Sequence, residues 1–181
     1  MTSEVLGYAA IGVGTVAVVA GIVMVSLLAW RRQVRRYIVT LVGGRETISS
    51  AFHTVEGVSK TLATATDGEL IAFALDPESE GRRALSDISE RMAISADELQ
   101  MMALPKRLWP PANALADAAA LLGGQAGRVS GSEGVEVLDA LGELDLVGVV
   151  SLLEAADAML LDMRERYRVA DDAVYGGGLY I

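Results

Sequence analysis

The chain has 181 residues, enough for one well-buried domain with an appendage but too few for two ordinary domains. It contains no cysteine and one histidine, His53, which excludes disulfides, thiolate catalysis and ordinary zinc or haem sites. Residues 1–30 carry one acid, residues 31–36 carry four arginines, and residues 37–181 carry 23 acids against 11 bases. A domain this acidic repels phosphate backbones, so we expect no nucleic-acid partner.

The glycine-rich N-terminal segment raises the question of a nucleotide site. Gly12-x-Gly14-x-x-Ala17 fits the fingerprint of a dinucleotide-binding turn. That turn needs a preceding strand and an acid about 20 residues later, whereas this segment lies in an uncharged run and is followed by RRQVRR. We therefore reject the nucleotide site and expect no cofactor.

The same segment predicts a transmembrane helix over residues 5–30. Twenty-six uncharged residues, at about 1.5 Å of rise each, exceed a hydrocarbon core of about 30 Å. Tyr8 and Trp30 are spaced to lie at the two membrane interfaces. A cleaved signal peptide would have a basic start and a shorter apolar core, so we expect a retained anchor.

The four arginines predict the orientation of this anchor. Arg31, Arg32, Arg35 and Arg36 flank only its C-terminal end, which places that end in the cytoplasm and residues 1–4 outside. The arginines either hold anionic lipid headgroups or serve only as the topology signal. Residues 31–44 are predicted to extend the helix to Gly43-Gly44. The expected protein is a single-pass protein of the cell membrane.

Small residues follow one face of the predicted anchor. They are Gly7, Ala10, Gly14, Ala17 and Gly21. In lipid, small side chains let helices approach closely, so this face predicts association with a second copy or with another membrane protein. The alternative is that glycine and alanine are simply common in membrane spans.

Residues 45–172 are predicted to form an acidic all-α domain, an antiparallel bundle of about four to five helices. Apolar residues recur at helical spacing in several stretches. The stripes that we expect to be buried are Ile48, Phe52, Val55, Leu62 and Ala65; Leu85, Ile88 and Met92; and Val149, Leu152, Ala156, Met159, Met163, Tyr167 and Ala170. Asp76-Pro77 and Ser95-x-x-Glu98 predict helix starts, and Gly123-Gly124 followed by residues 130–134 (SGSEG) predicts a flexible connection.

Two apolar features outside these stripes are candidates for partner contacts. Trp109, beside Lys106 and Arg107, could dock on a partner or on headgroups, or could instead plug one end of the core. Residues 173–181 are predicted to be a flexible tail. Its last residues, Leu179, Tyr180 and Ile181, are either a recognition peptide or a frayed terminus.

No catalytic or metal-binding arrangement is found in the sequence, so we expect a protein that is not an enzyme. The first hypothesis is a membrane-anchored scaffold, adaptor or accessory subunit. The alternative is a membrane-tethered regulatory module whose acidic helical face binds a basic cytoplasmic protein. Expected partners are membrane lipid and a protein, or a second copy of the chain held through the transmembrane helix.

Overall fold

A computed structural model of the chain describes the backbone of residues 2–169 and the side chains of residues 20–169. Several predicted site residues lie outside the described side chains: Gly7, Tyr8, Ala10, Gly14, Ala17, Leu179, Tyr180 and Ile181. The predicted tail over residues 173–181 is likewise outside the described part.

The described residues form six α-helices, one short 3₁₀-helix and no strand, which confirms the all-α prediction. The α-helices are α1 (Thr2–Ala63), α2 (Asp67–Leu75), α3 (Glu80–Met101), α4 (Trp109–Gly131), α5 (Glu136–Gly142) and α6 (Leu146–Tyr167), with the 3₁₀-helix η1 at Lys106–Leu108. The chain divides into two compact units, Met1–Tyr37 and Ile38–Ile181.

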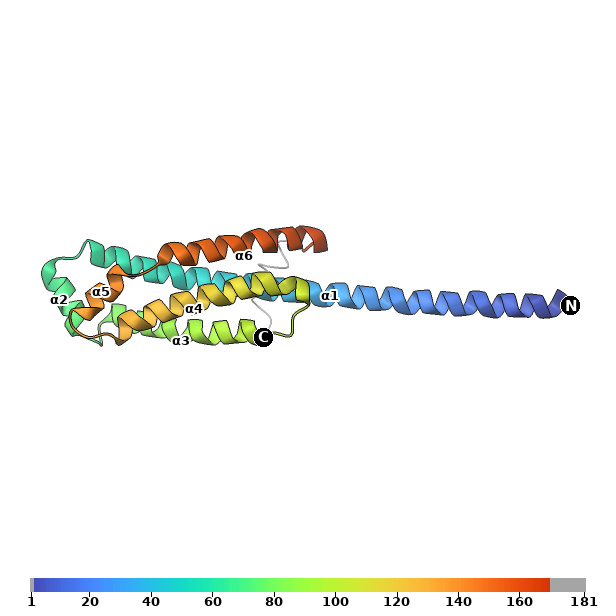
Figure 1. Ribbon diagram of the computed structural model, residues 1–181, viewed down its shortest axis with the longest axis horizontal. Helices are drawn as coiled ribbons and strands as arrows, with labels where there is room; N and C mark the ends of the chain where they lie inside the picture. The colour runs from blue at the N-terminus through green and yellow to red at the C-terminus, as the bar shows by residue number, and fades with distance from the viewer. Residues whose placement is uncertain (1, 170–181) are drawn as a thin grey trace. The chain divides into compact units, whose positions relative to one another are not determined.

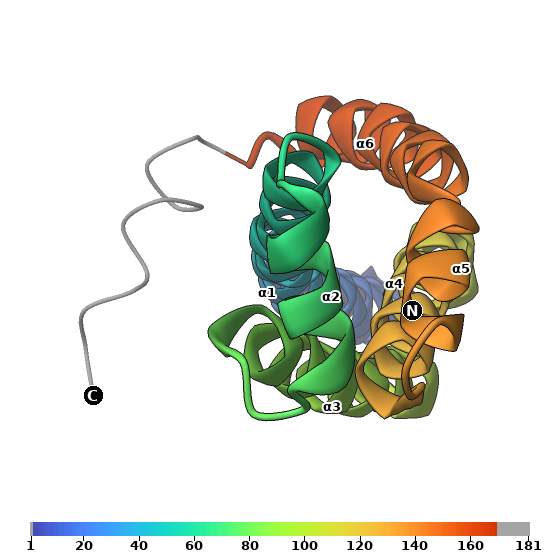
Figure 2. The same cartoon turned by 90° about the vertical axis from the view of Figure 1, so that its left-hand side faces the viewer.

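The second unit is an antiparallel four-helix bundle. Its long helices are α3, α4, α6 and the part of α1 from Ile38 onward, each running opposite to the next along the chain (Figure 1). Viewed along their axes they stand in the order α1, α3, α4, α6 around the core (Figure 2). The short helices α2 and α5 close one end of the bundle, here called the α2–α5 end.

One apolar face of each long helix supplies the core, as amphipathic periodicity requires. The predicted stripe of α3 is confirmed, because Leu85, Ile88 and Met92 are all buried. The predicted stripe of α1 is confirmed at Ile48, Phe52 and Val55, whereas Leu62 is only half-buried and Ala65 lies beyond the end of α1. The buried positions of α6 are Val149, Leu153, Ala156 and Leu160. The predicted α6 stripe was therefore wrong at Leu152 and Met159, which are only half-buried beside the buried Leu153 and Leu160. Met163 and Tyr167 are also half-buried, and Ala170 lies outside the described residues.

The prediction that Gly43-Gly44 ends the first helix was wrong, because α1 continues through both residues to Ala63. A glycine inside a helix costs about 1 kcal/mol relative to alanine. Leu41, on one side of the pair, and Ile48, on the other, are each completely buried. Burying one such side chain contributes about 1.5–3 kcal/mol, which outweighs the propensity cost of a glycine.

Two predicted helix starts were also wrong. α3 begins at Glu80, and Asp76 instead caps the C-terminal end of α2, where its carboxylate accepts from the N–H of Glu78 at 2.9 Å. Ser95 lies inside α3, which runs without a break to Met101. The buried residues Met92, Ala96 and Leu99 hold the helix together across the Ser95 motif.

The predicted connection was wrong at Gly123-Gly124, because both glycines lie inside α4; within residues 130–134, α4 ends at Gly131 and Ser132 is its C-cap. A Cβ atom on Gly123 would lie 2.9 Å from Cβ of Met92 on α3, and one on Gly127 would lie 2.6 Å from Oγ of Ser89. These two glycines let α4 approach α3 closely. Gly124 faces open space.

No helix among the residues that the structure describes is both long and apolar enough to cross a membrane. Most of the predicted span, residues 5–30, falls within residues 1–19, whose side chains are outside the described part.

We predict opposite effects of alanine at the two neighbouring glycines. Gly123→Ala should lower the free energy of unfolding by about 1–3 kcal/mol, because the new methyl group meets α3. Gly124→Ala should raise it by about 0.5–1 kcal/mol, because only helix propensity changes. Thermal unfolding followed by circular dichroism measures both. Equal stabilisation by the two variants would contradict the close α3–α4 approach.

Candidate functional site

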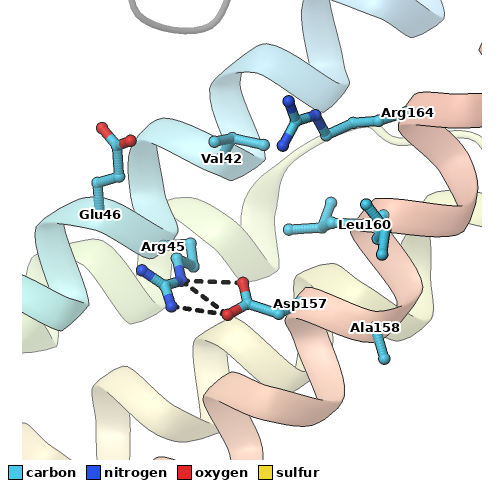
Figure 3. A pocket seen from close by; sticks show the side chains of 8 residues that line it. Val42, Arg45, Glu46, Asp157, Ala158, Leu160 and Arg164 are labelled. Carbon is cyan, nitrogen blue, oxygen red and sulfur yellow. Dashed lines mark hydrogen bonds and ion pairs between the residues drawn. The ribbon is translucent and has the colours of Figure 1, made fainter. Parts of the chain in front are cut away.

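A cavity of about 400 Å³ lies in the bundle between α1 and α6. Its lining residues are Val42, Arg45, Glu46, Asp157, Ala158, Leu160, Leu161 and Arg164. Figure 3 shows Arg164 extending from α6 toward Val42 on α1. None of the eight carries a hydroxyl, thiol or imidazole, and the lining combines apolar side chains with two arginines and two carboxylates.

An ion pair crosses the floor of this cavity. Arg45 on α1 donates from Nε and Nη2 to the two carboxylate oxygens of Asp157 on α6, at 2.9 and 2.6 Å (Figure 3). The pair is bidentate and therefore fixes the rotation of α6 relative to α1. Both side chains are partly exposed, so the pair adds little to the free energy of unfolding. Its main contribution is to the alignment of α6 with α1.

Arg82 is the one buried charged residue among those described, with 3% of its surface exposed. Its Nη2 donates to the carbonyl oxygens of Ser130, at 2.7 Å, and of Ser132; its Nη1 donates to that of Ala74, at 3.3 Å. The carbonyls of Ser130 and Ser132 lie at the C-terminal end of α4, and that of Ala74 lies at the C-terminal end of α2. The helix dipoles favour a cation at both places. Arg82 therefore ties two helix ends to α3 and fixes the α2–α5 end.

A capping box fixes the start of α2 at the same end. The N–H and the hydroxyl of Thr66 donate to the carboxylate of Glu69, at 2.7 and 2.8 Å, and lower the pKa of Glu69 below its ordinary value of 4.5. Because the folded pKa is lowered, this interaction stabilises the fold above the unfolded pKa. The stabilisation is lost as the pH falls through the folded pKa.

The α2–α5 end exposes large apolar side chains. They are Ile71 and Leu75 on α2, Val135 before α5, and Val147 in the first turn of α6. Isolated exposed apolar residues are ordinary, but four on the segments that close one end of the bundle indicate a surface suited to protein contact.

A second exposed surface follows α3 and is here called the acidic α3 face. Ile94 and Met101 are 53% and 84% exposed and are spaced seven residues apart, which places them on one side of the helix. The exposed acids of this helix include Asp87, Glu90, Asp97 and Glu98. The face therefore combines apolar contact area with negative charge.

The predicted residues near the start of the described side chains are exposed. Arg31, Arg32, Arg35 and Arg36 are exposed, as is Trp30, and no atom would lie within 4 Å of a Cβ on Gly21. Two of the arginines, Arg32 and Arg36, line a surface hollow together with Ala29, Gln33 and Tyr37. Gln33 donates to the hydroxyl of Tyr37 at 3.1 Å.

Trp109 is the first residue of α4 and is 49% exposed. Its Nε1 donates to the carbonyl oxygen of Leu104 at 2.9 Å, while Leu108 beside it is buried. The indole is therefore fixed by its polar edge, and half of its surface stays accessible. It is not a fully buried plug of the core.

Among the residues of these sites that were missed in the sequence, Arg45, Asp157 and Arg82 make contacts between helices. The partners Arg45 and Asp157 are 112 positions apart, and no local pattern joins them. Arg82 stands beside Arg83 in the sequence, and only the register of α3 makes one buried and the other exposed. The only indication in the sequence was that position 82 lies three residues before the predicted core residue Leu85. This spacing places both residues on the same face of a helix.

His53 is exposed on α1, with Nδ1 3.6 Å from a carboxylate oxygen of Glu56. Within the described part of the chain, no three histidine or acidic residues come together as a metal site. No protein-family model, curated protein or solved structure matches the chain. The described residues thus define a class by fold only: an all-α protein with a four-helix bundle.

We predict that two adjacent arginines differ strongly in their contribution to stability. Arg82→Met should lower the free energy of unfolding by about 2–4 kcal/mol, because three helix-end carbonyls lose their donor. Arg83→Met removes only an exposed ion pair with Glu78 and should change it by at most about 0.5 kcal/mol. Denaturant titration of both variants tests this. A loss no larger at Arg82 than at Arg83 would refute the anchoring role.

Proposed function

We propose that the protein is a single-pass membrane protein, with residues 5–30 as its anchor, and that residues 45–172 act as a cytoplasmic scaffold, adaptor or accessory subunit. The domain works by binding and has no catalytic activity of its own. One observation carries this proposal: apolar side chains are exposed around the whole circumference of α1 just before the arginines.

Consecutive positions of an α-helix are rotated by about 100°, so a run of four or more covers every direction. Between residues 22 and 28 the large apolar side chains are 50–67% exposed: Ile22, Val23, Met24, Val25, Leu27 and Leu28. A helix that is apolar on all sides belongs inside a protein core or a membrane. Together with the uncharged residues before it, this segment favours a membrane.

The arginines support the proposed orientation. All four are exposed directly after the apolar segment, where cytoplasmic headgroups would meet them. We propose two partners for the anchor, as predicted from the sequence. One is membrane lipid, and the other is a transmembrane helix of a second copy or of another membrane protein. Gly21, whose surroundings are open, is the one described member of the small-residue face.

The scaffold role is supported by the exposed apolar residues at the α2–α5 end. Arg82 and the Thr66 capping box hold this end in one conformation, so its exposed side chains form a preorganised surface. A rigid surface loses little conformational entropy on binding. The α2–α5 end is therefore the proposed docking surface for a protein partner.

The acidic α3 face favours a second candidate function, a regulatory module that binds a basic protein. Its apolar positions, Ile94 and Met101, can contact the apolar side of a partner helix. The acids around them attract basic flanking residues, with an attraction that salt screens.

We predict a membrane topology that labelling of single introduced cysteines can test, because the chain itself contains no cysteine. In intact cells, a membrane-impermeant maleimide should label Ser3→Cys and should label Ser151→Cys only after lysis. Replacing the four arginines by glutamate should weaken this difference, and replacing them by lysine should preserve it. Labelling of Ser151→Cys in intact cells would contradict the proposed orientation.

We predict that a photo-crosslinking residue distinguishes the two functions. At Leu75 it should capture a stoichiometric protein partner in cells if the α2–α5 end is the docking surface. At Ile94 it should do so if the acidic α3 face is used, and Asp97→Lys with Glu98→Lys should then abolish capture. The exposed position Ser151, on α6, is the control. Capture equal to that control at both positions would oppose both functions.

A further inference from the structure

The turn between α3 and α4 is a basic part of the acidic bundle. Residues 99–116 contain no aspartate or glutamate but include Lys106 and Arg107, although residues 37–181 carry 23 acids against 11 bases. We call residues 101–109 the basic turn. Both of its cations are exposed, and neither forms an ion pair within the described residues.

Other basic side chains of the bundle are matched by acids. Arg45 pairs with Asp157, Lys60 with Glu56, Arg83 with Glu78 and Arg128 with Glu143, at N–O distances between 2.5 and 2.8 Å. The positive charge of the basic turn therefore remains available to an external anion.

The basic turn also presents apolar surface next to its cations. Trp109 is 49% exposed. The indole N–H is already bonded to Leu104, so the accessible part of Trp109 is largely its apolar ring. A tryptophan beside lysine and arginine is typical of protein surfaces that meet a membrane interface.

The turn is fixed in shape. Leu104 and Leu108 are buried, at 8% and 1% exposure, and Pro105, Pro110 and Pro111 restrict the backbone on both sides of η1. Burial of the two leucines orients Lys106, Arg107 and Trp109 outward, and the backbone of the turn loses little further freedom on binding.

The basic turn lies at the end of the bundle opposite α2 and α5 (Figure 1). The bundle part of α1 begins at this same end, at Ile38, and α6 finishes there with Arg166 and Arg168 exposed. Only Tyr37 separates Ile38 in the chain from the arginines of residues 31–36. Covalent connection therefore keeps the turn close to whatever those arginines bind.

We propose that the basic turn docks on the anionic headgroups of the membrane, with Lys106 and Arg107 on phosphates and the Trp109 ring at the acyl boundary. This inference rests on the proposed function, because it requires the anchor. Charge complementarity with an anionic leaflet and chain continuity with the anchor favour lipid over a protein as the occupant. Docking at this end orients the α2–α5 end away from the membrane surface.

The two tryptophans of the chain, Trp30 and Trp109, allow the anchor and the turn to be tested separately. The full-length protein is reconstituted in vesicles of phosphatidylcholine, with or without phosphatidylglycerol, that contain lipids brominated on the acyl chains. Trp30→Phe leaves Trp109 as the only fluorophore. Trp109→Phe leaves Trp30, which reports on the anchor.

We expect Trp109 to be quenched in anionic vesicles, and the quenching to be reversed by high salt and to be weak in pure phosphatidylcholine. Adding Lys106→Gln and Arg107→Gln should shift the equilibrium away from the docked state about thirty-fold. The control variant, Arg83→Gln with Arg91→Gln, removes two positive charges from α3 instead of from the basic turn. It should leave the quenching of Trp109 unchanged.

Absence of Trp109 quenching while Trp30 is quenched would overturn the docking of the turn and leave the anchor intact. Absence of Trp30 quenching would overturn the anchor itself. Equal Trp109 quenching in neutral and anionic vesicles would overturn the role of the two cations, as would equal effects of the two double glutamine variants.

Discussion

Burial of one face of α1 from Ile38 onward is the interaction on which the bundle depends. Ile38, Leu41, Ile48 and Val55 lose nearly all contact with solvent, and together they form one wall of the core. At about 1.5–3 kcal/mol for each large side chain, this wall outweighs the propensity cost of Gly43 and Gly44. The helix is therefore continuous where its local sequence favours a break. Before Trp30 the same helix exposes apolar residues on every side, a pattern that a bundle face does not explain.

The two ends of the bundle are fixed by different chemistry. At the α2–α5 end, a buried guanidinium and a capping box satisfy backbone groups that the ends of helices leave without partners. At the other end, buried leucines and prolines fix the basic turn and leave its charges to solvent. Each end thus presents a rigid surface, one apolar and one cationic. This asymmetry is why we assign different partners to the two ends, protein to the first and lipid to the second.

Much of the helical content could be predicted from the sequence, because the apolar spacing in α1, α3 and α6 is strong. Positions of helix breaks could not, since they depend on tertiary contacts. Gly123 was interpreted as a connection, yet it lies where α4 approaches Met92 on α3, and only the partner helix reveals this reason for a glycine. In α6, Leu152-Leu153 and Met159-Leu160 each offer two apolar candidates for one core position, and the neighbouring helices decide which is buried.

The candidate surfaces were predictable to a smaller extent. Trp109 stood out in the sequence through its proline neighbours and cations, and the structure shows it half-exposed with its N–H bonded. Arg82 could not be singled out, because its role depends on carbonyls 8, 48 and 50 positions away. The exposed pair Ile94 and Met101 interrupts an otherwise polar face, and its significance appears only once the buried face of α3 is known.

The central claim is that α1 changes from lipid to protein surroundings between Trp30 and Ile38. A nitroxide scan in phospholipid vesicles tests it directly, because the cysteine-free chain allows one spin label at each position from 20 to 52. We expect residues 20–30 to be accessible to oxygen and inaccessible to a water-soluble nickel chelate, and residues from 38 onward to show a helical period in nickel accessibility. High nickel accessibility at residues 20–30 would contradict the account.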